Sequence, residues 1–281
     1  MSADGTLPAR ARDALVAGGP VTVAVLLGVA PLVVLFVESI GPGLALDHYL
    51  EATGPLYRGA LAYSLAMGVA VTLACLVVAY PVTYWLAHRC PARYRLPALV
   101  ALTLPLWLNY VVLNYTWVWI LARGGLLNRL LVGLGVVGEP LDVLYTDVSV
   151  FLGFVYIYLP YVVLTMYVSM ERFDYRLVEA ARDLGATNHR VFVDVVLPRT
   201  LPGAAAATLI VYARIAGAYA TPEILGSPGN VMVATLIVEA FREYFAYGFA
   251  AALSFVFLVT VAVGLLAGVS VPRVREALKP W

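Results

Sequence analysis

The chain has 281 residues, of which 62% are apolar and 12% are charged. Soluble domains contain about 45–50% apolar and about 25% charged residues, so the composition excludes an ordinary soluble protein. The mean hydropathy of +0.89 supports the same conclusion. The net charge of +1 gives no bulk attraction for nucleic acid. We therefore expect an all-α, polytopic protein that lies in the lipid bilayer.

Apolar stretches of the length needed for a membrane span recur along the chain. A helix needs about 20 residues to cross a hydrocarbon core about 30 Å thick. Six stretches satisfy this requirement and define a transmembrane domain over 21–271, between an N-terminal tail (1–20) and a C-terminal tail (272–281). We expect the first stretch to be a retained anchor, because it is too long for a signal-peptide core. The predicted spans are Val21–Ile40, Ala60–Leu86, Ala98–Leu121, Ser149–Met170, Ala204–Leu225 and Gly248–Val271.

The loop charges predict the orientation of these spans. Thirteen of the 18 Lys and Arg residues lie in the two tails, in the loop Arg89–Arg95 and in the segment Glu171–Pro202. The alternate loops contain four, and Arg214 lies within the fifth span. Because cytoplasmic loops are enriched in Lys and Arg, we expect both termini and Glu171–Pro202 to be cytoplasmic, in a multi-pass protein of the cell membrane.

Residues for nucleotide, metal or catalytic chemistry are scarce. The single lysine, Lys279, is followed by Pro280, so the chain has no G-x-x-x-x-G-K-[ST] phosphate loop. If ATP drives this protein, another chain binds the nucleotide. Cys75, in an apolar stretch, and Cys90, in a polar loop, predict neither a disulfide framework nor a metal site. We expect no catalytic residue, metal or cofactor in this chain.

The sequence lacks the residues that two other classes of membrane protein need. A secondary transporter needs coupling sites inside its spans, but the predicted spans contain only two acids, Glu38 at the edge of the first and Glu223 near the end of the fifth. A membrane-embedded enzyme needs a metal or a carboxylate pair, and His48, His88 and His189 are not at metal-ligand spacing. We therefore expect a protein that is not an enzyme.

The longest cytoplasmic loop has a pattern of its own. Leu177–Leu184 predicts a short amphipathic helix. Gly185 is expected to end it, because glycine accepts the left-handed conformation found at helix ends. Asn188 is expected to cap a second helix that runs to Leu197 and that Pro198 ends. The predicted result is a helical hairpin on the cytoplasmic membrane face.

This loop resembles the coupling loop of the membrane-spanning subunits of binding-protein-dependent ABC importers. The string EAARDLGATNHRVFVDVVLP fits E-A-A, three residues, G, nine residues, an aliphatic residue, any residue, and L-P. The family usually has Ile where Val195 stands. The resemblance implies a type I importer permease fold and a loop that couples transport to a separate ATPase. The matching positions are Glu179, Ala180, Ala181, Gly185, Val195, Leu197 and Pro198.

The loop residues suit docking to a partner. Ala180 and Ala181 are small enough to permit close approach, and Glu179 is placed to meet a basic group of the partner. The alternative for Glu179 is a weak surface pair with Arg182 on the same helix. Gly185 turns the chain toward the fifth span.

Other segments resemble spermidine/putrescine-type permeases. The resemblance implies an assembly of two permease subunits (the same or related chains), a pair of ATP-binding subunits that hold ATP and Mg²⁺, and an extracellular or periplasmic substrate-binding protein. The resembling segments are LPLW (Leu104–Trp107), GLLN (Gly125–Asn128), YIYLPYVVLTMYVSMERFD (Tyr156–Asp174) and GAYATPEILGSPGNVMVATLI (Gly217–Ile237).

Polar and aromatic residues on the third predicted span are candidates for the translocation path. Tyr110, Asn114 and Trp117 are spaced i, i+4 and i+7, so they share one helix face. Asn114 either faces the path or bonds a neighbouring span, since a membrane-buried amide needs a hydrogen-bond partner.

The fifth predicted span has a second candidate face. Arg214, Ala218 and Thr221 share it, and Gly217 and Pro222 are expected to break the helix near the external mouth. Spermidine/putrescine-type permeases commonly have an acid where Ala218 stands. Arg214, one turn away, either makes the cavity electropositive, or snorkels or pairs with an acid of another chain. The substrate therefore stays open between a polyamine-like solute and another small solute, such as ferric ion, thiamine or an anion.

Overall fold

The computed structural model describes residues 9–41, 46–227, 229 and 231–270. Within these ranges every regular element is a helix, which confirms the all-α class. The predicted C-terminal tail (272–281) and the first eight residues of the predicted N-terminal tail lie outside the described residues. Residues 9–20 of that tail are the first part of α1 (Ala9–Ile40).

Three long helices form the centre of the fold. α3 (Pro55–Tyr84), α7 (Asp147–Glu171) and α10 (Leu197–Ala216) pack against one another in every pairing. Their buried side chains, which include Phe154 and Val211, form one apolar cluster. Long apolar helices in a membrane pack against each other or against lipid. The position of this bundle therefore determines where the connecting loops lie.

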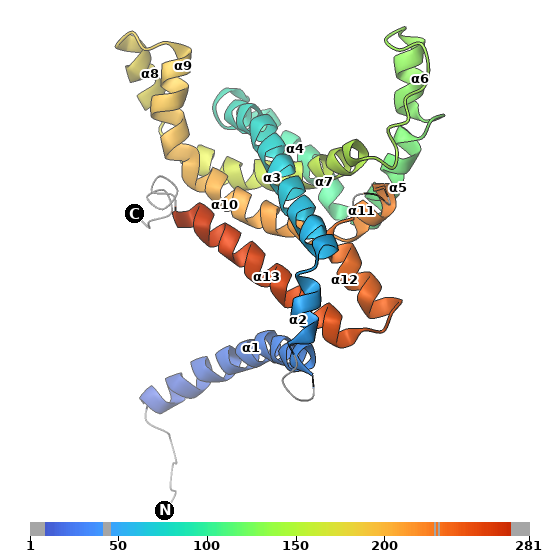
Figure 1. Ribbon diagram of the computed structural model, residues 1–281. Coiled ribbons are helices and arrows are strands. Elements are labelled where there is room, and N and C mark those ends of the chain that lie inside the picture. The colour runs from blue at the N-terminus through green and yellow to red at the C-terminus, as the bar shows by residue number, and fades with distance from the viewer. Residues whose placement is uncertain (1–8, 42–45, 228, 230, 271–281) are drawn as a thin grey trace, which may run out of the picture.

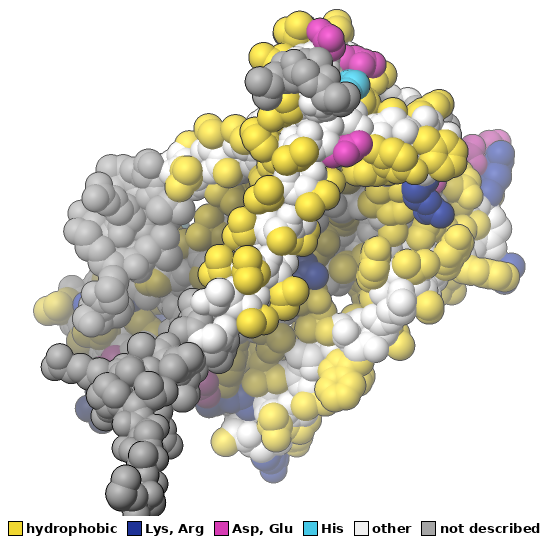
Figure 2. All heavy atoms as spheres, turned by 90° about the horizontal axis from the view of Figure 1, so that it is seen from below, with side chains coloured by type: hydrophobic (Ala, Val, Ile, Leu, Met, Phe, Trp, Pro, Cys, Tyr) yellow, Lys and Arg dark blue, Asp and Glu magenta, His cyan; other side chains and the backbone are white. Residues whose placement is uncertain are grey.

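A second group of helices surrounds α13 (Tyr247–Ser270). α2 (Asp47–Ala52), α12 (Val233–Arg242) and α1 contact it, and Val233 and Phe249 belong to its small apolar core. Outside these contacts α1 extends away from the bundle (Figure 1). In Figure 2, hydrophobic side chains cover much of the visible described surface, as expected for a protein surrounded by lipid.

Four helical segments of the described residues are long and apolar enough to cross a membrane. The number of possible spans rises to five if a bent pair of helical segments, Ala92–Trp107 and Tyr110–Gly133, is counted as one span. The apolar part of α1, Val25–Ile40, is shorter than these, so the count of six spans stays a prediction. The four segments are Pro55–Arg89, Asp147–Glu171, Asn188–Ala216 and Tyr247–Gly268.

The helix ends fall on two sides of the molecule in Figure 1. The first turns of α1, the last turns of α13 and the helices α8 (Arg176–Asp183) and α9 (Asn188–Arg190) lie on the left. α6 (Leu126–Gly133) and the turn between α12 and α13 lie on the right. The beginning of α1, the end of α13 and the helices α8 and α9, which belong to or adjoin segments predicted to be cytoplasmic, therefore share one side.

The third predicted span, Ala98–Leu121, is not a single helix. α4 (Ala92–Thr103) is followed by a 3₁₀ turn, η2 (Leu104–Trp107), and the chain then bends by 94° before α5 (Tyr110–Leu121). Pro105 cannot donate a backbone hydrogen bond, and the Asn109 side chain accepts one from the Val111 amide at 2.8 Å. The apolar run continues through this break, so hydropathy alone did not predict it.

The fifth predicted span, Ala204–Leu225, is displaced along the chain. Its helix runs from Asn188 to Ala216 and stops at Gly217, the expected position. Pro222 does not make the break, because it lies inside the next helix, α11 (Ala220–Leu225).

Pro198 does not end the second loop helix, contrary to the sequence expectation. A π-helical turn, η3 (Val191–Val196), precedes it, and the helix continues directly into α10. Proline lacks an N–H and clashes with the carbonyl of the preceding turn, and a π-helical turn relieves both problems by shifting the hydrogen-bond register. The Thr200 hydroxyl also donates to the Val196 carbonyl at 2.9 Å. The helix therefore passes through this proline.

The GLLN segment has a structural role. Asn128 is buried, donates to the carbonyls of Ala122 (3.2 Å) and Leu141 (2.9 Å), and accepts from the Leu141 amide (2.8 Å). A Cβ on Gly125 would overlap backbone carbonyls of α5, with Ile120 O at 2.5 Å. These residues hold the conformation of the segment after α5. The GLLN resemblance is therefore explained by a structural role.

α7 and α10 approach closely at Gly203. A Cβ there would collide with the Ser169 side chain and come within 3.5 Å of the Met166 backbone. Small residues permit this approach, which provides the packing energy between membrane helices.

Gly203→Ala is expected to destabilise the permease by about 1–3 kcal/mol, the usual effect of overpacking. Thermal unfolding of the purified complex measures it, and Ser169→Gly is expected to restore part of the loss by removing the opposing atoms. Gly59→Ala in α3 is the matched control, because nothing lies within 4 Å of the added Cβ. Equal stability of the Gly203 and Gly59 variants would contradict the assignment.

Candidate functional site

A hairpin of short helices stands at one end of the bundle. It comprises α8, a turn and α9–η3, and is called here the α8–η3 hairpin (residues 176–196). Gly185 has φ +83°, a left-handed conformation that glycine adopts without strain. Thr187, rather than Asn188, is the helix cap: its side-chain oxygen accepts from the Arg190 amide at 3.5 Å. Asn188 is already helical, so the predicted cap is wrong by one residue.

The hairpin has its own apolar core. Phe173, Val178, Val191 and Val196 are buried together and make it a packed unit. Ala181 is partly buried against this core. Ala180 is exposed, and the expectation that both alanines meet a partner stays a prediction.

The residues of the coupling motif divide into two groups. Glu179, Ala180, Gly185 and Pro198 are exposed, so they are accessible to a partner. The partly buried group consists of Ala181, Val195 and Leu197. The motif thus supplies both the outer surface of the hairpin and part of its packing.

Glu179 forms no ion pair with Arg182 in the structure. Among the described residues the salt bridge found joins Arg123 and Asp142, far along the chain. Arg182 instead donates to the Asn188 side chain at 3.2 Å. The Glu179 carboxylate is therefore available to a basic group on another chain.

Aromatic contacts fasten the hairpin to the end of α3. The His88 ring stacks on Tyr175, with centroids 4.2 Å apart and planes 12° apart, and Tyr84 contacts Tyr175 edge-on at 6.0 Å. The Tyr175 hydroxyl donates to the Met170 carbonyl at 3.2 Å. Burial, followed by nearby Tyr84, raises the pKa of Tyr175 to about 12, so this donor persists at neutral pH. Motion of the hairpin is thereby linked to two long helices.

A second site is a cavity of about 520 Å³ among α5, α7, α10 and α11. It contains four of the six residues predicted to line the translocation path: Tyr110, Arg214, Ala218 and Thr221. The tertiary structure thus brings the two predicted faces together.

Asn114 and Trp117 do not line this cavity. Asn114 is fully buried and donates to the Tyr110 carbonyl of its own helix at 2.8 Å. Its Oδ1 has no hydrogen-bond partner, and it lies 3.6 Å from where a Cβ on Gly153 of α7 would be. Trp117 packs edge-on against Tyr156 with centroids 5.6 Å apart. Both residues therefore belong to the packing between helices.

Arg214 is exposed in the cavity. Its guanidinium lies 5.4 Å from the centre of the Tyr161 ring, within cation–π range. No Asp or Glu is among the described residues that line this cavity. The local charge here is therefore positive.

Tyr158 and Tyr161 line the cavity from α7 and were not predicted as site residues from the sequence. Their i, i+3 spacing places them on one helix face, which is the signal that was available. Leu108, Asn109 and Tyr219 were also missed. These three residues lie at the breaks before α5 and α11. Only the tertiary structure shows that both breaks lie at the cavity.

The long apolar helices indicate a multi-pass membrane protein, and the cavity among four helices is the kind of site that a transport protein needs. The chain belongs to the family of binding-protein-dependent transport system inner membrane components, which matches residues 53–276. It is a permease subunit of an ABC importer, as the following relatives indicate.

The relatives include spermidine/putrescine permeases. The chain is 36% identical to the spermidine/putrescine transport system permease protein PotB of Escherichia coli K12 over 221 residues, which cover 79% of each chain. The PotB protein of Haemophilus influenzae is 33% identical and covers 70% of this chain and 69% of its own length. The Escherichia coli inner membrane ABC transporter permease YdcU is 30% identical, with coverage of 69% and 66%.

Solved structures show the same fold. A chain of a bacterial alginate ABC transporter, in complex with an alginate-bound periplasmic protein, has a TM-score of 0.77 at 17% identity and covers 94% of this chain and 96% of its own. A chain of the MetNI methionine ABC transporter has a TM-score of 0.56 at 18% identity, with coverage of 78% and 95%.

Proposed function

We propose that the α8–η3 hairpin couples this permease to a separate ATPase on the cytoplasmic side of the membrane. The observation that carries the proposal is the hairpin itself, a packed unit with an exposed Glu179 that forms no salt bridge with a described residue and a small exposed Ala180 beside it. A rigid hairpin transmits the motion of a bound partner, whereas a flexible loop absorbs it.

The proposed assembly contains two permease subunits, two ATPase subunits and an external substrate-binding protein. The ATPase binds ATP and Mg²⁺, and this chain supplies no catalytic group. The alginate transporter, solved with its periplasmic binding protein, supports this arrangement by its similar fold. Alternation between two packings of the helices then opens the cavity to either side.

A single cysteine tests the coupling proposal. Ala180→Cys is exposed, whereas the native Cys75 and Cys90 are buried. In the full importer, a thiol-directed cross-linker is expected to join Cys at 180 to the ATPase, and a membrane-impermeant thiol reagent is expected to label it only from the cytoplasmic side. Leu134→Cys, 76% exposed beyond α6, is the matched control and is expected to label only from outside. Labelling of both positions from one side would overturn the orientation.

For the substrate, the cavity favours a small anionic or neutral solute, or a metal carried as an anionic complex. Arg214 lines the cavity with no acid among the described lining residues, and a cation in such a site attracts anions and repels polyamines.

A polyamine is the second candidate, and one structural observation favours it besides the names of the relatives. A neighbouring cavity of about 560 Å³, between α11 and α12, shares Tyr219 with the first. Glu223, Glu239 and Glu243 line it, with Arg242 as the one cation among its described lining residues. Competition between labelled solutes, described in the Discussion, separates the two candidates.

A further inference from the structure

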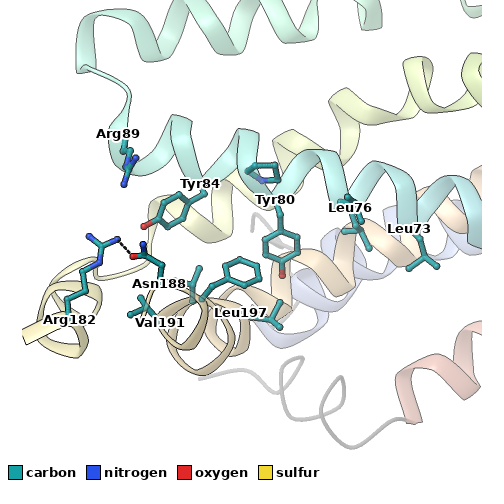
Figure 3. A pocket seen from close by; sticks show the side chains of 13 residues that line it. Leu73, Leu76, Tyr80, Tyr84, Arg89, Arg182, Asn188, Val191 and Leu197 are labelled. Carbon is teal, nitrogen blue, oxygen red and sulfur yellow. Dashed lines mark hydrogen bonds between the residues drawn. The ribbon is translucent and has the colours of Figure 1, made fainter. Parts of the chain in front are cut away.

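A groove of about 690 Å³ lies between α3 and η3, on a side of α3 not used by the cavities described above. Its walls are largely aliphatic and aromatic, and Figure 3 shows their side chains converging from the two helices. The apolar lining consists of Leu73, Leu76, Val77, Tyr80, Pro81, Tyr84, Val191, Phe192, Val196 and Leu197.

The length of this apolar lining matches one leaflet of a bilayer. From Leu73 to Tyr84 an α-helix rises about 16 Å, at about 1.5 Å per residue. One leaflet is half of a hydrocarbon core about 30 Å thick. Val77 is 72% exposed, so the groove opens sideways along the apolar surface of α3. A single acyl chain therefore fits its dimensions and its opening.

The groove ends at two arginines. Arg89 and Arg182 line this end, and Figure 3 places both beside Tyr84 and Asn188. The bond from Arg182 to the Asn188 side chain, at 3.2 Å, holds that guanidinium at the groove mouth. Neither arginine forms a salt bridge with a described residue. Two guanidinium groups of like charge, side by side, create a site for an anion.

We propose that this groove binds an anionic phospholipid of the cytoplasmic leaflet, with one acyl chain along α3 and the phosphate at Arg89 and Arg182. The proposal rests on the cytoplasmic placement of the α8–η3 hairpin proposed above. Charge complementarity and the one-leaflet length distinguish this occupant from a protein segment. Clusters of basic residues at the cytoplasmic ends of spanning helices attract anionic headgroups.

The bound lipid would join two parts of the chain. Arg89 is the last residue of the π-helical turn that follows α3, η1 (Trp85–Arg89), and Arg182 belongs to α8, so one phosphate contacts both the bundle and the hairpin. The position of the hairpin then depends on the lipid.

The test uses the complete importer, purified in detergent, with a photoactivatable phosphatidylglycerol that has the reactive group in its acyl chain. Peptide mapping is expected to find adducts on residues 73–81 or on η3. The double variant Arg89→Gln/Arg182→Gln is expected to lower adduct yield about tenfold, because both headgroup contacts are lost. Val77→Trp, which fills the groove and leaves the arginines in place, is expected to lower it as well.

The controls separate this site from general attraction to anionic lipid. Arg93→Gln removes a charge from the same loop outside the groove and is expected to leave adduct yield unchanged. Phosphatidylcholine with the same acyl chain is expected to label weakly, and inorganic phosphate is expected not to compete. Equal labelling by both lipids, an unchanged double variant, an equal loss in Arg93→Gln, competition by phosphate, or no adduct in the assembled complex would each overturn the proposal. Lipid binding is measured without transport, so its failure is distinct from failure of the ATPase cross-link at position 180.

Discussion

Glu179→Ala is expected to reduce ATP-driven uptake by about tenfold or more while the permease reaches the membrane at normal levels. Glu179 is exposed on α8 and has no salt bridge within the described chain, so its removal costs the isolated fold little. At the interface it leaves a basic group of the ATPase without its partner, and such a loss costs about 2–5 kcal/mol when the pair is desolvated. The measurement is uptake into vesicles that contain the full importer, together with the amount of ATPase that co-purifies.

Asp194→Ala is the matched control for this variant. Asp194 is an exposed acid of the same hairpin, but it lies on η3 and outside the coupling motif. We expect its uptake to stay near that of the unmodified protein. Normal uptake by Glu179→Ala, or an equal loss in Asp194→Ala, would remove the coupling assignment.

Gly185 gives a second measurement on the same surface. Nothing lies within 4 Å of a Cβ at this position, so a substitution meets open space and only the φ of +83° is unfavourable. Asn and Asp tolerate this conformation best among other residues. Gly185→Asp is expected to abolish coupled transport by placing a charge at the docking surface, and Gly185→Asn, which is uncharged and of the same size, is expected to retain more. Equal transport by the two variants would contradict a charge effect.

Arg214→Ala is expected to reduce uptake of an anionic solute by about tenfold or more, with ATPase activity retained, because the cavity loses its cation without losing its helices. Arg214→Lys is expected to retain part of the uptake, since the charge stays and the planar contact with Tyr161 weakens. Reconstituted vesicles with the full complex, supplied with labelled solutes and competed with spermidine, citrate or phosphate, provide the measurement.

The same experiment decides between the two substrate candidates. Arg129→Ala, which removes an arginine from α6 outside the cavity, is the control and is expected to leave uptake unchanged. Selective uptake of spermidine that survives Arg214→Ala would refute the anionic proposal. A loss of that uptake in Glu223→Gln and Glu239→Gln would then support the polyamine candidate, because these acids line the neighbouring cavity.

Local sequence patterns predicted much of this architecture. Apolar runs of the right length predicted the helices at α3, α7 and α13, and the loop motif predicted a helical hairpin with its turn at Gly185. Gly217 also marked the end of α10. Each of these features depends on residues that are close along the chain, which is why spacing alone sufficed.

The sequence was less informative where one local signal competed with another. Pro105 and Asn109 indicate a break, but the apolar run around them predicts a continuous span, and the structure has the 94° bend. Pro198 indicates a helix end, but η3 shifts the hydrogen-bond register and the helix continues. In both cases the hydrogen bonds of the neighbouring turn decide the outcome.

The sequence by itself determined the class of protein, the approximate spans and the coupling motif, because hydropathy and motif spacing are properties of a linear chain. Only the tertiary structure decided which faces meet. It placed Tyr158 and Tyr161 in one cavity with Arg214, buried Asn114 between helices, and packed part of Ala181 against the hairpin core. The physical reason is that an apolar helix in a membrane is apolar on all sides. Its lipid-facing, protein-facing and cavity-facing sides differ little in composition, and packing against neighbouring helices selects among them.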